Sequence, residues 1–288
     1  MSRLVAENIV KTYGNKNALD GVSLTLESGK IYGLIGRNGA GKTTLLSILT
    51  SQNPATSGSV QFDGQPVWEN PAVLDQLCFS RELNPMAGNN ANTMKVKEYL
   101  RIAATFLPYW DKAMAEELVK IFGLDTKKRI NKLSKGMMSM VTVIVALASK
   151  APFTFLDEPV AGLDVVAREQ FYRILIDEFT ETGRTFVIST HIIEEAADVF
   201  EEVIMVDKGK ILLKENAQEL MERSVHVSGH ADEVDQAVAG LNVYREEKLG
   251  RSKGVTVMLK PGQKIDTSYD VHVQKLSLQK LFVALCGE

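Results

Sequence analysis

The chain has 288 residues, 45% of them hydrophobic and 24% charged, which is enough apolar sequence for one full core and a smaller second unit. Lys and Arg number 33 against 36 Asp and Glu, and a net charge of -3 supplies no surplus positive field, so nucleic acid is not expected as a partner. No apolar run approaches the roughly 20 residues of a membrane-crossing helix. The N-terminus lacks the apolar core of a signal peptide, and the two cysteines are far apart in the sequence. We therefore expect a protein of the reducing cytoplasm, with neither a disulfide nor a zinc site.

The N-terminal part of the chain predicts an antiparallel ribbon and then a strand, a loop and a helix. Residues 4–26 alternate in hydropathy, with turn signals at Tyr13-Gly14 and Asp20-Gly21. Residues 30–35 form a β-prone run that leads into the glycine-rich stretch GRNGAGKTT, and apolar residues at 45–49 then follow at helical spacing. The glycine-rich stretch is therefore expected between a strand and a helix.

The middle of the chain changes to helical periodicity at residues 93–148, which predicts an inserted helical subdomain. Beyond it, strands are expected at 153–156, 185–189 and 203–206, and helices at about 165–182 and 192–199. Strands that alternate with helices predict an α/β fold, with a mostly parallel core sheet that is covered on both faces.

The composition changes again after about Arg223, where short alternating runs are separated by turn residues. They predict a small strand-rich appendage at 224–288, closed by an amphipathic helix at 278–285, so we expect two domains, 1–223 and 224–288. The apolar strand faces of the appendage, which carry Val255 and Val257, need a cover. Either a second copy of the chain or its own first domain would provide one.

Residues 36–43 fit the pattern G-x-x-x-x-G-K-[ST], whose backbone N–H groups wrap phosphate oxygens at the N-terminus of a helix. The four fixed positions coincide by chance about once in 30,000 windows if glycine makes up about 7% of residues. Lys42 would contact the β- and γ-phosphates, and the Thr43 hydroxyl would bind Mg²⁺. The expected nucleotide-binding residues of this loop are Asn38, Gly39, Ala40, Gly41, Lys42, Thr43 and Thr44.

A second polar group follows the apolar strand at 153–156, where Asp157 and Glu158 precede a proline. Asp157 can hold Mg²⁺, and Glu158 can polarise an attacking water, although an acidic turn after a strand is the alternative. The next expected strand delivers His191 to the same edge of the sheet. A contact of His191 with the γ-phosphate is favoured over a packed or surface histidine.

The order of these motifs, from residue 4 to about residue 220, resembles the ATP-binding cassette family, the nucleotide-binding subunits of ABC transporters. The resemblance implies an ATPase with ATP and Mg²⁺ as ligands, on a P-loop cassette with an antiparallel β-subdomain. It assigns the Walker A loop to 36–44, the Walker B strand to 153–157 with Glu158 as catalytic base, the D-loop to 161–164 and the switch histidine to His191.

Two further sites follow from the resemblance. The family signature LSGGQ corresponds to LSKGM at 133–137, which keeps Ser134 and Gly136, the residues that touch the γ-phosphate across a dimer. By itself, LSKGM would be the start of a helix capped by Ser134. Tyr13 takes the place of the aromatic residue that stacks on adenine in the family, and a core tyrosine is the alternative.

Two positions depart from the family pattern. The glutamine of the Q-loop is missing, and alignment on the aromatic residue of CFSRE puts Glu82 there, with Arg81 beside it. Glu82 could still approach Mg²⁺ as a metal ligand. Whether this segment keeps the Q-loop's usual contact with the membrane partner is left open by the sequence. Met140 replaces the common arginine after the signature, in a methionine run that either forms an apolar surface or packs.

The resemblance implies an ATP-hydrolysing subunit that powers a membrane exporter, in the branch that handles antimicrobial or cytolytic peptides and bacitracin-type immunity. Its expected partners are a membrane-spanning permease on a separate chain and a second cassette, in a homodimer or a heterodimer. The expected location is the cytoplasmic face of the membrane, through the permease.

The alternatives belong to other classes. A soluble ABC ATPase with a non-transport role would have two cassettes or a long coiled-coil insert, whereas this chain has one phosphate loop and 115 positions between Lys42 and Asp157. A GTPase would carry an Asn-Lys-x-Asp motif after the loop, and a small-molecule kinase would not need LSKGM. Glu158 and His191 argue against a nucleotide-clamped structural subunit.

Overall fold

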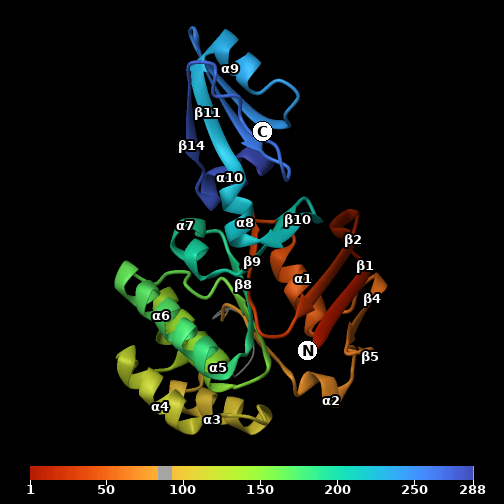
Figure 1. The fold of residues 1–288 in the computed structure, drawn as a ribbon. Coiled ribbons are helices and arrows are strands. Elements are labelled where there is room, and N and C mark those ends of the chain that lie inside the picture. Colours follow the sequence, from red (N-terminus) through yellow and green to blue (C-terminus); the bar gives the residue numbers. More distant parts are fainter. Residues whose placement is uncertain (84–92, 288) are drawn as a thin grey trace. The chain divides into compact units, whose positions relative to one another are not determined.

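The computed structural model describes residues 1–83 and 93–287 (Figure 1). The chain divides into two compact units, one of Met1–His191 with Ile204–Leu213 and one of Ile192–Val203 with Lys214–Glu288. Separate folding of 1–223 and 224–288 stays a prediction. None of the helices in the described part of the chain is both long and apolar enough to cross a membrane.

Most of a six-stranded sheet lies in the first unit, with the strand order β10-β9-β3-β8-β7-β6. Its strands are β3 (Ile31–Gly36), β6 (Leu77–Ser80), β7 (Phe153–Asp157), β8 (Thr185–Thr190), β9 (Glu202–Asp207) and β10 (Lys210–Asn216). The β3–β8, β8–β7 and β7–β6 pairs are parallel. Strands β3, β7 and β8 are buried along their whole length, as apolar runs in a sheet covered on both faces are. The predicted α/β fold is confirmed.

The first unit also contains an antiparallel sheet, with the order β2-β1-β4-β5. Its strands are β1 (Arg3–Tyr13), β2 (Lys16–Glu27), β4 (Ser57–Phe62) and β5 (Gln65–Pro66). The hairpin turn lies at Gly14, as predicted. The turn predicted at Asp20-Gly21 is wrong, because β2 continues through it. Gly21 has a φ of +70° in an irregular stretch of the ladder, and Asp20 N donates to Gly209 O at 2.9 Å, so this glycine permits a bulge.

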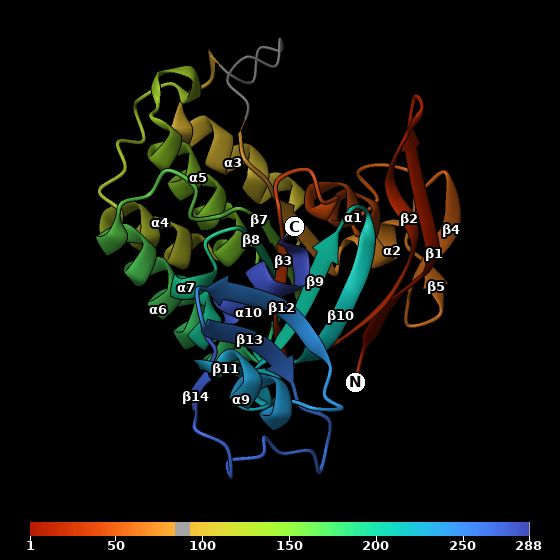
Figure 2. The same ribbon diagram turned by 90° about the horizontal axis from the view of Figure 1, so that it is seen from above.

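Among the described residues of the first unit, six α-helices accompany these sheets, and Figure 2 shows them from a second direction. They are α1 (Lys42–Leu49), α2 (Pro71–Leu74), α3 (Val96–Phe106), α4 (Lys112–Ile121), α5 (Lys135–Ala148) and α6 (Val165–Thr182). Helices α3, α4 and α5 form the predicted insert. The side chains of Asp111, Ser134 and Asp164 cap the N-termini of α4, α5 and α6 by accepting a backbone N–H three residues ahead.

The second unit contains a four-stranded antiparallel sheet in the order β12-β13-β11-β14. Its elements are α7 (Ile193–Ala196), α8 (Ala217–Glu222), β11 (Ser224–His230), α9 (Ala231–Ala237), β12 (Val243–Leu249), β13 (Ser252–Met258), β14 (Val271–Lys275) and α10 (Leu278–Cys286). The helix expected at 192–199 is a short α-helix followed by a 3₁₀ turn at Ala197–Val199.

The apolar strand faces of this unit do not need a second chain to cover them. Val225, Val227, Val255 and Val257 are buried in one cluster with Val234 of α9. The expectation that Val255 and Val257 await an outside partner is therefore wrong, because a helix of the same unit covers them. Cys78 and Cys286 are both buried, and burial raises the pKa of the Cys78 thiol.

Candidate nucleotide-binding site

The carboxyl ends of β3, β7 and β8 meet at one edge of the core sheet, because these strands are parallel neighbours. In an open α/β sheet, ligands bind at this edge. The glycine-rich loop follows β3, Asp157 ends β7, and His191 follows β8. Three motifs that are far apart in the sequence are thereby brought together.

Two glycines of the loop are required by close backbone packing. A Cβ atom on Gly36 would lie 2.6 Å from Val206 O, and one on Gly41 would lie 2.7 Å from Ala18 O. Gly41 also has a φ of +112°, which side chains rarely allow, and it directly precedes α1. The loop therefore leads into the N-terminus of α1, which carries the positive end of the helix dipole.

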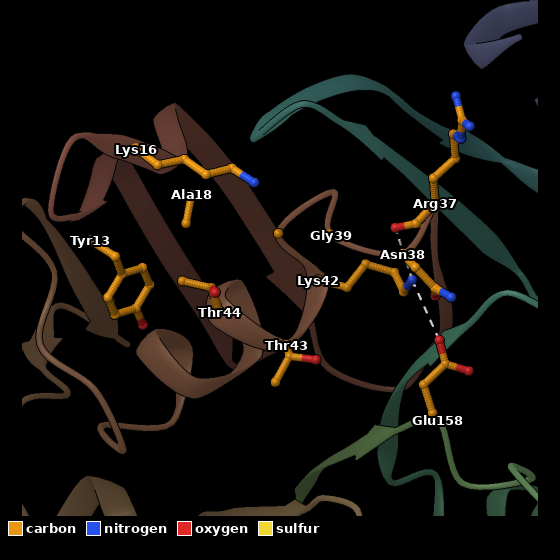
Figure 3. A pocket seen from close by; sticks show the side chains of 11 residues that line it. Tyr13, Lys16, Ala18, Arg37, Asn38, Gly39, Lys42, Thr43, Thr44 and Glu158 are labelled. Carbon is orange, nitrogen blue, oxygen red and sulfur yellow. Dashed lines mark hydrogen bonds and ion pairs between the residues drawn. The ribbon is translucent and has the colours of Figure 1, made fainter.

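The side chain of Lys42 places a buried positive charge in this loop, with 6% of the residue exposed. Its Nζ donates to Gly36 O at 2.7 Å and to Arg37 O at 3.4 Å, and it forms an ion pair with Glu158 Oε1 at 3.4 Å (Figure 3). The ammonium is thus positioned within the loop by backbone carbonyls. A phosphate group in the loop would compete with Glu158 for it.

Asp157 and Thr43 place two oxygen donors side by side. Thr43 Oγ1 donates to Asp157 Oδ2 at 2.6 Å, and Ser189 Oγ donates to Asp157 Oδ1 at 2.5 Å. A carboxylate beside a hydroxyl is a donor set of the kind that Mg²⁺ uses together with substrate phosphates. These residues therefore fit the metal that the sequence predicted for them.

Glu158 has a φ of +51°, a left-handed conformation that is uncommon for a residue other than glycine. Its backbone N–H donates to Ser189 O at 3.1 Å and to Ser189 Oγ at 3.0 Å. Its Oε2 lies 2.7 Å from His191 Nδ1. Backbone and histidine contacts together orient the carboxylate between Lys42 and His191.

The cavity at the loop has a volume of about 320 Å³. It is lined by Tyr13, Lys16, Ala18, Arg37, Asn38, Gly39, Gly41, Lys42, Thr43, Thr44 and Glu158 (Figure 3). Tyr13 is 51% exposed, so it is not the core residue that the alternative reading supposed. Its ring borders the same cavity as the loop, and its hydroxyl accepts from Asn53 Nδ2.

The signature residues do not join this cavity, since none of its described lining residues belongs to 133–137. Ser134 is exposed and caps α5 by accepting from Met137 N at 3.2 Å. Gly136 has a steric role as well, because a Cβ there would lie 2.4 Å from Gly162 O. The signature and the D-loop are therefore packed against each other within one chain.

Glu82 is also absent from the described lining of the cavity, and its Oε1 pairs with Lys135 Nζ at 3.2 Å. The residue in the Q-loop position thus contacts the signature segment, and its metal-binding role stays a prediction. In the methionine run, Met138 is buried, whereas Met137 and Met140 are partly buried. Met138 therefore packs, as one of the two alternatives for this run expected.

Sequence reasoning missed Ser189, which joins Asp157 to the backbone of Glu158. The available signal was its position on the strand before His191, but its partners follow from the pairing of β7 with β8. Lys16 and Ala18 were missed as lining residues because their neighbourhood depends on how the antiparallel sheet lies against the loop.

Comparison with known proteins gives a consistent result. The ABC transporter family matches residues 19–161. The lantibiotic transport ATP-binding protein SrtF of Streptococcus pyogenes is 30% identical, over 77% of this chain and 97% of that protein. The bacitracin transport ATP-binding protein BcrA of Bacillus licheniformis is 31% identical, over 71% and 67% respectively. The taurine import ATP-binding protein TauB of Burkholderia thailandensis is 30% identical, over 72% and 80%.

A solved structure gives the same fold. The dimeric ATP-binding cassette in a post-hydrolysis state bound to ADP and Pi has a TM-score of 0.64 at 22% identity, over 74% of this chain and 98% of that chain. At this identity the likeness concerns the fold alone.

We predict that Lys42→Ala weakens the binding of ATP by about tenfold or more, because it removes a charged donor from the loop. Isothermal titration calorimetry with ATP and Mg²⁺ measures the affinity. Lys112→Ala is the matched control, since that side chain is 84% exposed on α4. Equal affinity of Lys42→Ala and wild type would show that the loop does not bind phosphates.

Proposed function

Because the chain belongs to the ABC transporter family, as an ATP-binding subunit that hydrolyses ATP, we propose that it powers a membrane exporter of peptides or other amphipathic compounds. The observation that carries the catalytic part is the placement of Glu158 between Lys42 and His191. Export is supported by the likeness to the lantibiotic and bacitracin transport proteins. The taurine import relative makes direction the point that a transport assay must decide.

We assign binding to the loop and its cation. Lys42 would exchange Glu158 for phosphate oxygens, and Tyr13 would stack on the adenine at the far side of the cavity. Thr43 and Asp157 would hold Mg²⁺, which when bound neutralises negative charge on the phosphates. Asn38, Gly39, Ala40, Gly41 and Thr44 complete the set of loop residues that we assign to the nucleotide.

Glu158 acts as the general base in this proposal. Once Lys42 turns to a phosphate, Glu158 loses its cation and can accept a proton from an attacking water. His191 keeps the carboxylate oriented through Nδ1, and it also lies at the sheet edge where the γ-phosphate would be.

The complete active site in this proposal needs two chains. Ser134 and Gly136 are outside the described lining of their own chain's cavity, so we assign them to the γ-phosphate bound by a second cassette. That cassette is a second copy or a related chain. A separate membrane-spanning permease would hold the pair at the cytoplasmic face of the membrane and use their closure to move substrate.

The transport proposal is tested with the tagged chain in membranes of its own host. Mass spectrometry of the co-purified membrane protein identifies the permease, and inside-out vesicles that contain both are then given a labelled cationic amphipathic peptide. ATP-dependent uptake into these vesicles is the expected result, because their interior corresponds to the outside of the cell. ATP hydrolysis without uptake, or uptake in the opposite orientation, would contradict export.

Glu158→Gln should lower the rate of ATP hydrolysis about a hundredfold or more and leave ATP binding intact, because a general base contributes about 10² to 10⁴ in rate. Steady-state phosphate release and calorimetry measure the two quantities. Glu116→Gln serves as the control, since that carboxylate is 63% exposed on α4. Turnover within a few-fold of wild type would reject Glu158 as the base.

Activity should also depend on two chains. Ser134→Arg chains and Glu158→Gln chains should each be inactive alone. Each mixed dimer, however, has one intact site, formed by Glu158 of the Ser134→Arg chain and Ser134 of the Glu158→Gln chain. Phosphate release by the mixture should therefore rise well above that of either variant. If both variants fold and associate but the mixture stays inactive, the arrangement across two chains is wrong.

A further inference from the structure

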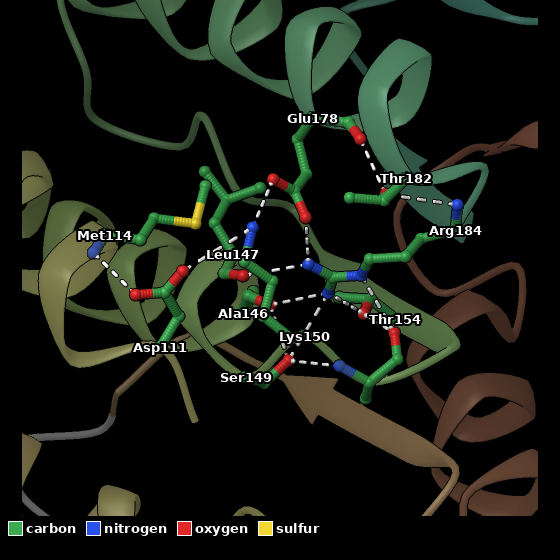
Figure 4. Close-up of polar contacts among 11 residues, drawn as sticks. Asp111, Met114, Ala146, Leu147, Ser149, Lys150, Thr154, Glu178, Thr182 and Arg184 are labelled. Atoms are coloured by element: carbon green, nitrogen blue, oxygen red, sulfur yellow. Dashed lines mark hydrogen bonds and ion pairs between the residues drawn. The ribbon is translucent and has the colours of Figure 1, made fainter. Parts of the chain in front are cut away.

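Arg184 lies directly before β8 and is 6% exposed, which is unusual for a guanidinium group. Figure 4 shows that it is surrounded by polar partners. It donates to three backbone carbonyls, from Nε to Ala151 O at 2.9 Å, from Nη1 to Leu147 O at 2.9 Å and from Nη2 to Ala146 O at 3.1 Å. Its side-chain partners are Glu178 Oε1 at 2.8 Å, Thr154 Oγ1 at 2.6 Å and Ser149 Oγ at 3.4 Å.

Two of these carbonyls, at residues 146 and 147, belong to the last turn of α5. The last four carbonyls of a helix have no N–H donor within the helix, and they carry the negative end of its dipole. A cation that binds them stabilises the helix end. Burial lowers the pKa of Arg184, and Glu178 opposes that shift, so the buried charge is balanced within the cluster.

The four elements that Arg184 joins carry functional motifs at their opposite ends. Helix α5 begins after Ser134, β7 ends at Asp157, α6 begins after Asp164 of the D-loop, and β8 ends beside His191. Thr154 lies on β7 and Glu178 on α6. The cluster therefore lies at the end of these elements that is remote from the reacting groups.

Helix α5 is held to its neighbours through side chains and not through a backbone ladder. Strands β3, β7 and β8 hold one another through their backbone ladders. Helix α5 has 14 residues and is about 21 Å long. Ser139 Oγ, in its second turn, donates to Ala161 O at 2.6 Å, Ser80 Oγ of β6 donates to Thr142 O in its middle at 2.8 Å, and Arg184 donates to carbonyls of its last turn.

A second arm of the cluster reaches α4. Lys150 Nζ lies 2.7 Å from Glu178 Oε2 and 3.8 Å from Asp111 Oδ2. Asp111 is the N-cap of α4, where its Oδ1 accepts from Met114 N at 2.9 Å, and its own N–H donates to Ala148 O at 2.8 Å. The end of α5 and the start of α4 are thus connected to α6 through the same carboxylate (Figure 4).

We propose that Arg184 is a positioning residue for ATP hydrolysis, which acts by fixing the C-terminal end of α5 and thereby the placement of Ser134 and Gly136 toward the nucleotide of the partner cassette. This inference rests on the proposed arrangement of the active site across two chains. It assigns the effect of Arg184 to the partner's site, since the chain's own phosphate loop is held by the sheet.

The test uses Arg184→Lys, which keeps a positive charge beside Glu178 but loses the planar fork that reaches Ala146, Leu147 and Ala151. The Arg184→Lys chain is mixed with a tenfold excess of an inactive partner, so that nearly all of it is in mixed dimers. With Glu158→Gln chains, the only competent site uses the phosphate loop of the Arg184→Lys chain. With Ser134→Arg chains, the only competent site uses its signature.

Phosphate release per mixed dimer should match the wild-type mixture within twofold when the partner is Glu158→Gln, and should fall at least fivefold when the partner is Ser134→Arg. Equal losses in both mixtures, no loss in either, or a loss confined to the Glu158→Gln mixture would each overturn the proposal. A residue that only stabilised the fold would affect both mixtures alike.

Two further variants keep the test decisive. Thr154→Val removes one partner of Arg184 at nearly constant volume, and it should show the same one-sided loss if Arg184→Lys does not fold. Leu4→Ala removes buried volume from β1, and as a control for lost stability it should not give a one-sided loss. Wild-type chains in the two mixtures test the two-chain arrangement itself, so its failure is separate from a failure of Arg184.

Discussion

The parallel pairing of β7 with β8 is the constraint on which the site depends, because its register sets Asp157 opposite Ser189. From that register, Ser189 Oγ reaches one oxygen of Asp157, and Thr43 from the loop reaches the other. The same serine accepts the backbone N–H of Glu158 and so holds this residue in its left-handed conformation. A slip of β8 by one residue against β7 would turn Ser189 to the other face of the sheet, away from Asp157.

The elements that form this edge are also tied together at their other ends. At the edge with the phosphate loop, Lys42 and Glu158 line the cavity and His191 pairs with Glu158, whereas the remote end holds Arg184 and Glu178 in a buried ion pair. Breaking a buried pair by removing one partner is costly, so the remote cluster can keep one arrangement while the exposed edge exchanges partners. This division suits a protein whose loop must release and rebind nucleotide.

The parts that sequence alone predicted are those with a local cause. The glycines and Lys42 of the loop, the apolar strand before Asp157 and the capped start of α5 at Ser134 each depend on neighbours in the chain, and the structure has them as expected. Gly21 was misassigned because a left-handed glycine serves a bulge as well as a turn. Ser189 and Arg184 were missed because their partners, such as Asp157 and Glu178, come from other elements of the fold. The cover of Val255 by α9 was missed for the same reason.

The central claim is that this sheet edge binds the phosphates of ATP and is completed by a second cassette. A crystal structure of the Glu158→Gln chain, crystallised with ATP and Mg²⁺, tests both parts at once. We predict phosphates wrapped by residues 36–43, with Mg²⁺ beside Thr43 and Asp157 and Ser134 of the partner subunit facing the γ-phosphate. Nucleotide bound outside this loop, or a saturated site that leaves Ser134 of the partner subunit remote, would contradict the account.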